Sequence, residues 1–476
     1  MATEIDPGEV VPERPPRFPR GDWRIRWRVA LVGALIAAVG GSGWLLDQEL
    51  GPRAAASGSP EGLTTGAWFC PHGGGPGLRA WVVITNPGLE RASIRMTTLT
   101  SLGEEAVRSF SLGPGRQTFR EVRGDDASAA TEVEYFGGQV GASALLQSGT
   151  PGGGVAAEAC VAGPQREWFL PDERTTEGEN AYLVVMNPFA ESASFDIELL
   201  TEGRIVRPAA LTPFALGPRS STAIHVNDHA LLFEAEATIS ARVILRIGRV
   251  IVGSTIVTDG GIRAEAGVSL SSDQWIFPAA GYAEPMEVVV MDTGEATTEM
   301  TVASQSANAQ RLVSGPEGLS VAGGGVGTFQ IDGLPDAGAV VQSSNQTPFV
   351  SLLRLSGPNG DVANLTGASS SASVWLVMPS VPPSGGTQFV VLENPGRVDA
   401  LVSFTVIGAR GGAALAAVTV PAGRTVTIAL APTVGKRAVS VLVRASEGTI
   451  VAASVSYSSG GKGYAATLAL PMKNLG

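Results

Sequence analysis

Histidine and cysteine are scarce in this sequence, which has three of the first and two of the second in 476 residues. A structural zinc site usually takes four cysteine or histidine ligands, and a nucleophilic cysteine needs a base beside it. The chain has too few of these side chains for either chemistry to be expected. No serine–histidine–aspartate order or pair of catalytic carboxylates stands out. We therefore expect no enzymatic activity and no catalytic, cofactor-binding or metal site.

Charge is also sparse. Charged residues make up 16% of the chain, the only lysines are at positions 436, 462 and 473, and the net charge is −11. A chain with net negative charge is a poor partner for nucleic acid, because the phosphate backbone is negative as well. The sequence therefore disfavours a nucleic-acid-binding function.

Glycine and proline are abundant, with 61 and 31 residues, and 44% of the chain is hydrophobic. These two residues form turns and end strands, so the composition is typical of a β-rich chain. At this length one compact core is not expected, whereas three or four domains are.

An uncharged and apolar run lies near the N-terminus and reads "VALVGALIAAVGGSGWLL" (29–46). Its 18 residues are long enough to cross a bilayer as a helix. Three arginines precede it and two acids follow, so the positive-inside rule places residues 1–28 in the cytoplasm as a disordered tail. The rest of the chain is then extracytoplasmic. A cleavable signal peptide is the alternative, with a cleavage site near the three alanines at 54–56.

After a linker at 47–66, one pattern occurs four times, with a period near 100 residues, and defines units at 67–165, 166–273, 274–373 and 374–476. Each unit opens with a tryptophan shortly before a proline, as in "WFCP" and "WFLP". An apolar run then ends in a turn, as in "WVVITNPG" and "FVVLENPG", and a second turn such as "LGPGRQT" precedes a later strand. The anchor residues are Trp68, Trp168, Trp275, Trp375, Asn86, Asn187 and Asn394.

The turn anchor has a local physical cause. In Asn-Pro-Gly, proline fixes φ at the first central position, glycine is expected to supply a positive φ at the next, and asparagine caps the turn with its side chain. Between the anchors the hydrophobic period is two: in "SFDIELL" (194–200), Phe195, Ile197 and Leu199 are expected to face the core.

Seven or eight short strands per unit predict four tandem immunoglobulin-like β-sandwiches, arranged as a rod or bent array. The alternative is a closed, β-propeller-like array in which each unit provides two four-stranded blades. Unequal unit lengths and self-contained pairing within each unit favour separate sandwiches.

Cys70 and Cys160 both fall in the first unit, on its opening and closing strands. Cys70 occupies the position where the other units have Leu170, Phe277 and Met378, so the thiol replaces a core hydrophobe. In an extracytoplasmic domain the natural interpretation is a disulfide between the two. His72 and the glycines after it are then the loop that leaves the opening strand.

Two other features resemble binding sites. His225, Asp228 and His229 in "HVNDH" could hold a metal on a helix, but the segment follows a strand and reads as a solvated loop. The four anchor tryptophans could stack on sugars, but their recurrence at one place in every unit favours a role in the core.

The arginine-bearing tail, the single span and the repeated "WFxP … NPG … LGPGR" units resemble the actinobacterial envelope proteins catalogued as domain of unknown function 5719. The resemblance covers about residues 29–476 and implies a membrane-tethered, extracytoplasmic protein. It carries over no functional residues.

We expect a structural or interaction protein at the cell membrane, with an unidentified envelope protein as partner. A module that binds cell-wall glycan or another ligand is the second hypothesis. An enzyme would require a polar cluster formed between domains.

Overall fold

The computed structural model describes residues 65–149, 153–232, 239–258, 261–314, 318–408, 415–458 and 463–472. The chain divides into two compact units, Met1–Arg53 and Ala54–Gly476, and every described residue belongs to the second. The expected tail (1–28), the expected span (29–46) and all of the linker except residues 65 and 66 lie outside the described residues. Within the described ranges, no helix is long and apolar enough to cross a membrane.

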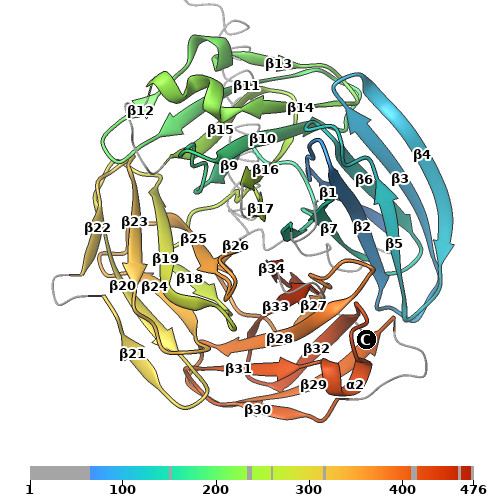
Figure 1. The fold of residues 1–476 in the computed structure, drawn as a ribbon, viewed down its shortest axis with the longest axis vertical. Coiled ribbons are helices and arrows are strands. Elements are labelled where there is room, and N and C mark those ends of the chain that lie inside the picture. Colours follow the sequence, from blue (N-terminus) through green and yellow to red (C-terminus); the bar gives the residue numbers. More distant parts are fainter. Residues whose placement is uncertain are drawn as a thin grey trace, which may run out of the picture. The chain divides into compact units, whose positions relative to one another are not determined.

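The described residues form antiparallel strands almost throughout, which confirms the all-β prediction (Figure 1). They fall into four groups, here called modules 1 to 4. Module 1 contains β1 (Thr65–Cys70), β2 (Leu78–Asn86), β3 (Ala92–Thr100), β4 (Gly103–Leu112), β5 (Arg116–Val122), β6 (Ala130–Phe136), β7 (Gly141–Ser148) and β8 (Val155–Ala159). Module 2 contains β9 (Glu167–Leu170), β10 (Glu179–Asn187), β11 (Ala193–Leu200), β12 (Ile205–Val206), η1 (Ala209–Leu211), β13 (Phe214–Leu216), β14 (Ser220–His225), η2 (Val226–Leu232), β15 (Ser240–Ile247), β16 (Ile251–Thr258) and β17 (Gly261–Ala266).

The other two modules repeat this order. Module 3 contains β18 (Gln274–Phe277), β19 (Ala283–Asp292), β20 (Thr298–Gln305), β21 (Gln310–Leu312), β22 (Leu319–Val321), β23 (Val326–Ile331), β24 (Gly338–Ser343), β25 (Phe349–Ser356) and β26 (Val362–Thr366). Module 4 contains β27 (Val374–Val377), β28 (Gly386–Asn394), β29 (Ala400–Ile407), β30 (Val418–Val420), β31 (Arg424–Ala429), α2 (Ala431–Val434), β32 (Ser440–Glu447), β33 (Val451–Ser458), β34 (Tyr464–Leu468) and β35 (Leu470–Pro471).

Alternation of side chains explains why these segments form half-buried strands. In β11, the inward residues Phe195, Ile197 and Leu199 are fully buried, as predicted. In β29, buried and exposed residues alternate over six positions. One face of each such strand therefore packs on a core, as expected for antiparallel sheets.

Each module is a sandwich of two sheets that share a core. In module 1 one sheet has the order β1-β6-β3-β4 and the other β5-β2-β7-β8. Trp68 of the first sheet and Val83 of the second belong to one buried cluster. Two sheets that face each other across one core form a sandwich within the module.

The strand order differs from that of an immunoglobulin domain, in which the first strand pairs with the second and the seventh with the sixth. Here β1 pairs with β6, and β7 pairs with β2. Modules 2, 3 and 4 have the same exchange, since β9 pairs with β15, β18 with β24 and β27 with β32. The immunoglobulin-like assignment is therefore corrected to a sandwich whose two end strands have exchanged sheets.

The four modules also contact one another in a closed ring, so the expectation of a rod or bent array is wrong. In the described residues each module provides two sheets of four or five strands, which agrees with the alternative of a closed array. Their innermost strands pack in the cyclic order β8, β17, β26, β34 and back to β8. Between modules 4 and 1, the Gln117 side chain donates to the Ala438 carbonyl at 3.1 Å, and the hydroxyls of Thr85 and Ser440 are 2.7 Å apart. The core of module 1 continues into Leu376 and Leu470 of module 4.

Candidate functional site

The four repeated tryptophans are buried at equivalent places, with at most 3% of the residue exposed. Each indole N–H donates to a backbone carbonyl across the module. The pairs are Trp68 with Val140, Trp168 with Val250, Trp275 with Phe349 and Trp375 with Ile450, at 2.6, 3.2, 2.8 and 2.7 Å. Both the rings and their polar atoms are therefore occupied within the fold and are not available for stacking on a sugar.

The three anchor asparagines hold the turn that follows the second strand. The Asn394 amide donates to the carbonyls of Val398 and Val420 at 2.8 and 2.9 Å, and its Oδ1 accepts from the Gly396 N–H at 2.9 Å. Asn86 and Asn187 make the same three contacts in their modules. In module 3, Asp292 replaces asparagine and accepts from the Gly294 N–H at 2.8 Å.

The prediction that the turn glycine has a positive φ is wrong. Gly88, Gly294 and Gly396 all lie outside the left-handed region. Because the side chain of residue 86, 292 or 394 binds the backbone directly, the turn does not depend on the conformational freedom of the glycine.

Cys70 and Cys160 form a disulfide, with their Cα atoms 4.6 Å apart. Both residues are fully buried, Cys70 at the end of β1 and Cys160 just after β8. The bond closes a loop of the chain with a sequence separation of 90. It therefore joins the opening and closing strands of module 1.

His72 follows this strand and is buried between modules 1 and 2. Its Nδ1–H donates to the Gly73 carbonyl at 2.8 Å, and its Nε2 accepts from the Thr131 hydroxyl at 3.0 Å. The Thr255 hydroxyl of module 2 donates to the His72 carbonyl at 2.8 Å. Desolvation lowers the pKa of His72 to about 4. His72 is therefore a neutral part of the junction between the two modules.

This burial predicts a loss of stability in weak acid. In the folded chain His72 takes up its proton near pH 4, whereas in the unfolded chain it does so near pH 6.5. Stability is therefore full above pH 6.5 and falls as the pH drops toward 4, by about 3 kcal/mol in the limit of one fully buried group. Urea unfolding of the wild type and His72→Gln from pH 7 to 4 measures this. The free energy of unfolding should fall more steeply with decreasing pH in the wild type than in His72→Gln. Equal slopes in the two proteins would contradict the lowered pKa of His72.

His225 and Asp228 are close but form no metal centre. The His225 Nδ1 lies 2.9 Å from the Asp228 carboxylate, and the ring stacks on Tyr182 with centroids 4.7 Å apart. The segment enters η2, a short 3₁₀ helix that also carries His229. In the parts of the chain that the structure describes, no group of three or more histidines, cysteines or acids is arranged to hold a metal ion.

The most unusual site lies where module 2 meets module 3. The segment after each tryptophan strand enters a junction: His72 contacts β16, and the Ala280 carbonyl accepts from the Tyr464 hydroxyl of module 4 at 3.0 Å. In module 2 this segment begins with Asp172, Glu173 and Arg174. Together with charged and polar side chains around it, it forms the polar junction, defined as Glu158, Asp172, Glu173, Arg174, Glu179, Arg263, Glu265, Glu287, Arg354 and Asn364.

Asp172 is the centre of the polar junction. Its side chain is fully buried and accepts from two nitrogens of Arg354, one of them Nε at 3.2 Å. The Asn364 amide donates to the same carboxylate at 3.1 Å. Desolvation alone would raise the pKa of Asp172, but the charges of Arg354 and Arg263 outweigh it and hold this pKa well below the usual range. Asp172 is therefore ionised, and it links module 2 to β25 and β26 of module 3.

Two more carboxylates pair with the arginines. Glu287 of β19 accepts from Arg354 and from Arg174, both at 3.1 Å. Glu179 of β10 accepts from Arg263 at 2.7 Å. Three arginines thus face three paired carboxylates, and these charges balance.

Three further glutamates, Glu158, Glu173 and Glu265, have no cation left for them. All three are buried. In the described part of the chain, no hydrogen-bond partner reaches either oxygen of Glu158 or Oε1 of Glu265, and the donor beside Glu173 is the Ser254 hydroxyl. Desolvation raises the pKa of each well above the usual range, and for Glu265 the charges of Glu173 and Asp172 add to the effect. The closed junction therefore favours the protonated form of these carboxyls.

The polar junction is nearly closed to solvent. Only Arg174, Glu179 and Glu287 reach the surface, with 15 to 22% of each side chain exposed. Neither of the two surface grooves described below includes a residue of the cluster. The arrangement can bind two modules together and hold protons.

The sequence analysis missed this cluster. One signal was present, because Asp172 stands where the aligned units have His72, Ala279 and Ser380. A second was the pair Arg263 and Glu265 in "GIRAEAG", a strand that otherwise reads as apolar. Both are charges at positions where repeat alignment predicts burial.

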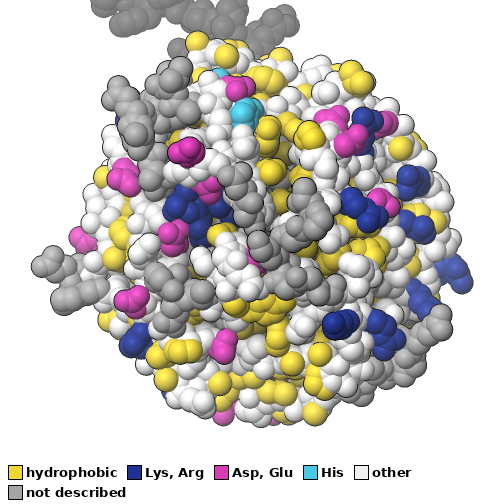
Figure 2. Space-filling model, viewed as in Figure 1, with side chains coloured by type: hydrophobic (Ala, Val, Ile, Leu, Met, Phe, Trp, Pro, Cys, Tyr) yellow, Lys and Arg dark blue, Asp and Glu magenta, His cyan; other side chains and the backbone are white. Residues whose placement is uncertain are grey.

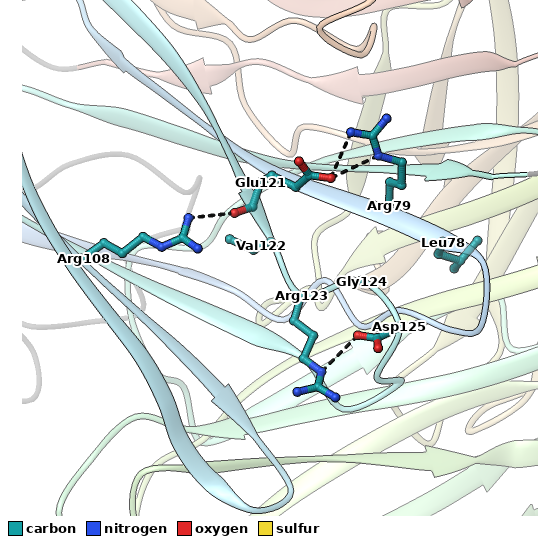
Figure 3. A pocket seen from close by; sticks show the side chains of 8 residues that line it. All are labelled: Leu78, Arg79, Arg108, Glu121, Val122, Arg123, Gly124 and Asp125. Atoms are coloured by element: carbon teal, nitrogen blue, oxygen red, sulfur yellow. Dashed lines mark hydrogen bonds and ion pairs between the residues drawn. The ribbon is translucent and has the colours of Figure 1, made fainter.

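One shallow groove lies at the open edge of module 1, between β4 and β5 (Figure 3). Arg79 pairs with the Glu121 carboxylate at 3.0 Å, Arg108 donates to the Glu121 carbonyl at 3.1 Å, and Arg123 pairs with Asp125 at 3.0 Å. A second groove lies between modules 1 and 2, beside Leu102 and Phe214. The arginines of the first groove are already paired, so it is not a strong anion site.

The family of unknown function DUF5719 matches residues 119–373 and 358–471, which together are most of the sequence. The chain belongs to this family. The resemblance noted from the repeats is therefore confirmed at the level of the family. The matched residues include modules 2, 3 and 4 and the later strands of module 1, but not β1 to β4. A comparison with curated proteins finds no match.

Two solved structures have limited likeness to this DUF5719 protein. The crystal structure of Thermotoga maritima 1070 is 19% identical, covers 22% of this chain and 96% of its own, and has a TM-score of 0.20. The tetra-tandem repeat in the extending region of a large adhesion protein is 11% identical, covers 80% and 92%, and has a TM-score of 0.10. At these scores neither likeness carries an argument about fold or function.

Proposed function

We propose that this protein is a membrane-tethered, extracytoplasmic scaffold or interaction protein of the cell envelope. The observation that carries the proposal is the closed ring of modules, in which each repeated polar residue is used to hold the fold. A chain whose repeated features serve rigidity is suited to presenting surfaces rather than to performing chemistry. The tether is the apolar segment 29–46, with the N-terminus in the cytoplasm.

The disulfide supports the extracytoplasmic location. Disulfides persist in oxidising compartments and are rare in the cytosol. The pair Cys70–Cys160 uses the only two cysteines of the chain.

The rim of module 1 is the surface we propose for partner contact. Basic side chains follow the edge of the molecule on the side where module 1 lies (Figures 1 and 2). Its exposed arginines are Arg79, Arg91, Arg95, Arg108, Arg116 and Arg123. In β4 at this rim, Val107 is an exposed hydrophobic residue beside these charges. A mixed apolar and basic edge is a suitable contact surface for a protein partner.

Site-directed photo-crosslinking in native membranes tests the proposal. Because only three lysines are present, lysine-reactive reagents sample too little of the surface. A photoreactive residue at Ser109, on β4, should give adducts with a membrane or envelope protein, whereas the matched exposed position Ser403, on β29, should give fewer. Retention on purified cell-wall glycan without any protein adduct would instead favour a ligand-binding module, and labelling of the modules from the cytoplasmic side would overturn the location.

A further inference from the structure

The unpaired glutamates of the polar junction are surrounded by charged groups from every neighbouring segment. Glu173 and Glu265 face the groups of their own module, those of module 3 across the junction, and one glutamate of module 1. These groups are Asp172 and Arg174 in the segment after β9, Glu179 on β10, Arg263 on β17, Glu287 on β19, Arg354 on β25, Asn364 on β26 and Glu158 on β8.

The charges of this cluster set how many protons it holds. Arg174, Arg263 and Arg354 are balanced by Asp172, Glu179 and Glu287. If Glu173 and Glu265 also ionised, the closed junction would contain two uncompensated charges beside Asp172, with only the Ser254 hydroxyl beside Glu173 and the Asn364 amide 3.3 Å from Glu265 as side-chain donors. Once the modules separate, water can solvate both carboxylates, which then ionise at neutral pH.

We propose that the junction between modules 2 and 3 is a proton-dependent latch, which is closed while Glu173 and Glu265 carry protons and opens as those protons are released. Glu158 strengthens the response, because its carboxyl lies near Glu265 and also lacks a partner. Closure takes up protons, so closure weakens as the pH rises above the ordinary glutamate range. Asp172 has the opposite effect on closure, because the junction loses the ion pair between Asp172 and Arg354 when the pH falls. This loss takes place only in strong acid.

The junction between modules 3 and 4 provides an internal control. There the inner strands meet through Ala363 and Leu365 of β26 and Tyr464 and Ala466 of β34, all in one apolar cluster. These apolar contacts have no protons to release. One buried carboxyl, that of Glu393 on β28, lies elsewhere in this junction, against Gly338 of module 3, and desolvation raises its pKa. Opening caused by pH should therefore be stronger at the interface of β17 with β26, where three buried glutamates release protons, than at that of β26 with β34.

Hydrogen exchange of the full-length protein, followed by mass spectrometry from pH 5.5 to 9 and corrected for the intrinsic exchange rate, tests the latch. The protection factor of peptides covering β17 should fall as the pH rises. The fall should approach about tenfold per pH unit for each proton released. Peptides covering β34 should show a smaller slope. In Glu173→Gln/Glu265→Gln the protection of β17 should depend on pH much less than in the wild type, with only the contribution of Glu158 left, whereas the exposed control Glu121→Gln should behave as wild type.

Two results would overturn the latch. One is constant protection of β17 in the wild type across this range, which needs no variant. The other is a double variant that folds and keeps the wild-type pH dependence. If the double variant does not fold, the comparison of β17 with β34 in the wild type decides. A latch predicts that the protection factors of the two strands depend on pH with different slopes, whereas a general loss of stability at high pH predicts equal slopes.

Discussion

Replacing Arg354 with leucine should lower the free energy of unfolding by about 3–5 kcal/mol, because it leaves a buried carboxylate without its main partner. Arg354 is 6% exposed and supplies two hydrogen bonds to Asp172 and one to Glu287. Arg263 and Arg174 remain near Asp172, both at 3.6 Å, but neither is hydrogen-bonded to it. Urea unfolding followed by circular dichroism at pH 7 measures the loss.

The matched control is Arg79→Leu. Arg79 also pairs with a carboxylate, that of Glu121 at 3.0 Å, but both side chains are 56% exposed. Water solvates such a pair, so this change should cost only about 0–1 kcal/mol. The double variant Arg354→Leu/Asp172→Asn should recover part of the loss, since it also removes the stranded charge. Equal costs for the two arginines would mean that the polar junction does not hold the modules together.

The features predicted well from the sequence have local causes. An asparagine before proline binds the backbone two residues later, whatever the rest of the chain does. Alternation such as that of Phe195, Ile197 and Leu199 identifies the buried face of one strand. Repetition then shows that the four tryptophans occupy one structural position. Local rules and repetition were enough for an all-β chain of similar modules.

Features that depend on distant partners were missed. Strand order cannot be read from alternation, because β1 has the same pattern whether it pairs with β2 or with β6. Ring closure rests on contacts such as that between Thr85 and Ser440, which are 355 residues apart. The polar junction combines segments around Asp172, Arg263 and Arg354, and no single segment contains the charge balance that defines it.

Removing the disulfide should have the other large effect. In the chain-entropy description, a cross-link over this span stabilises the fold by about 4–5 kcal/mol, and measured losses on removing native disulfides are about 2–5 kcal/mol. The variant Cys70→Ala/Cys160→Ala should therefore unfold at a clearly lower urea concentration than the oxidised wild type. Both cysteines are fully buried, so part of any loss comes from missing sulfur atoms rather than from the missing bond.

Two comparisons separate these contributions. Cys70→Leu/Cys160→Gly introduces the residues that module 2 has at the equivalent positions, Leu170 and Gly267, and so restores the apolar packing of an uncross-linked module. Wild type unfolded under reducing conditions keeps the sulfur atoms but loses the bond.

If the bond itself stabilises module 1, the Cys70→Leu/Cys160→Gly variant and the reduced wild type should both be less stable than the oxidised wild type. Reductant should not affect either double variant. If instead oxidised and reduced wild type unfold at the same urea concentration, module 1 is held by its contacts with modules 2 and 4. Those contacts include the hydrogen bond between Thr255 and His72 and the apolar contact with Leu376, so the neighbouring modules would stabilise the first one without the covalent link.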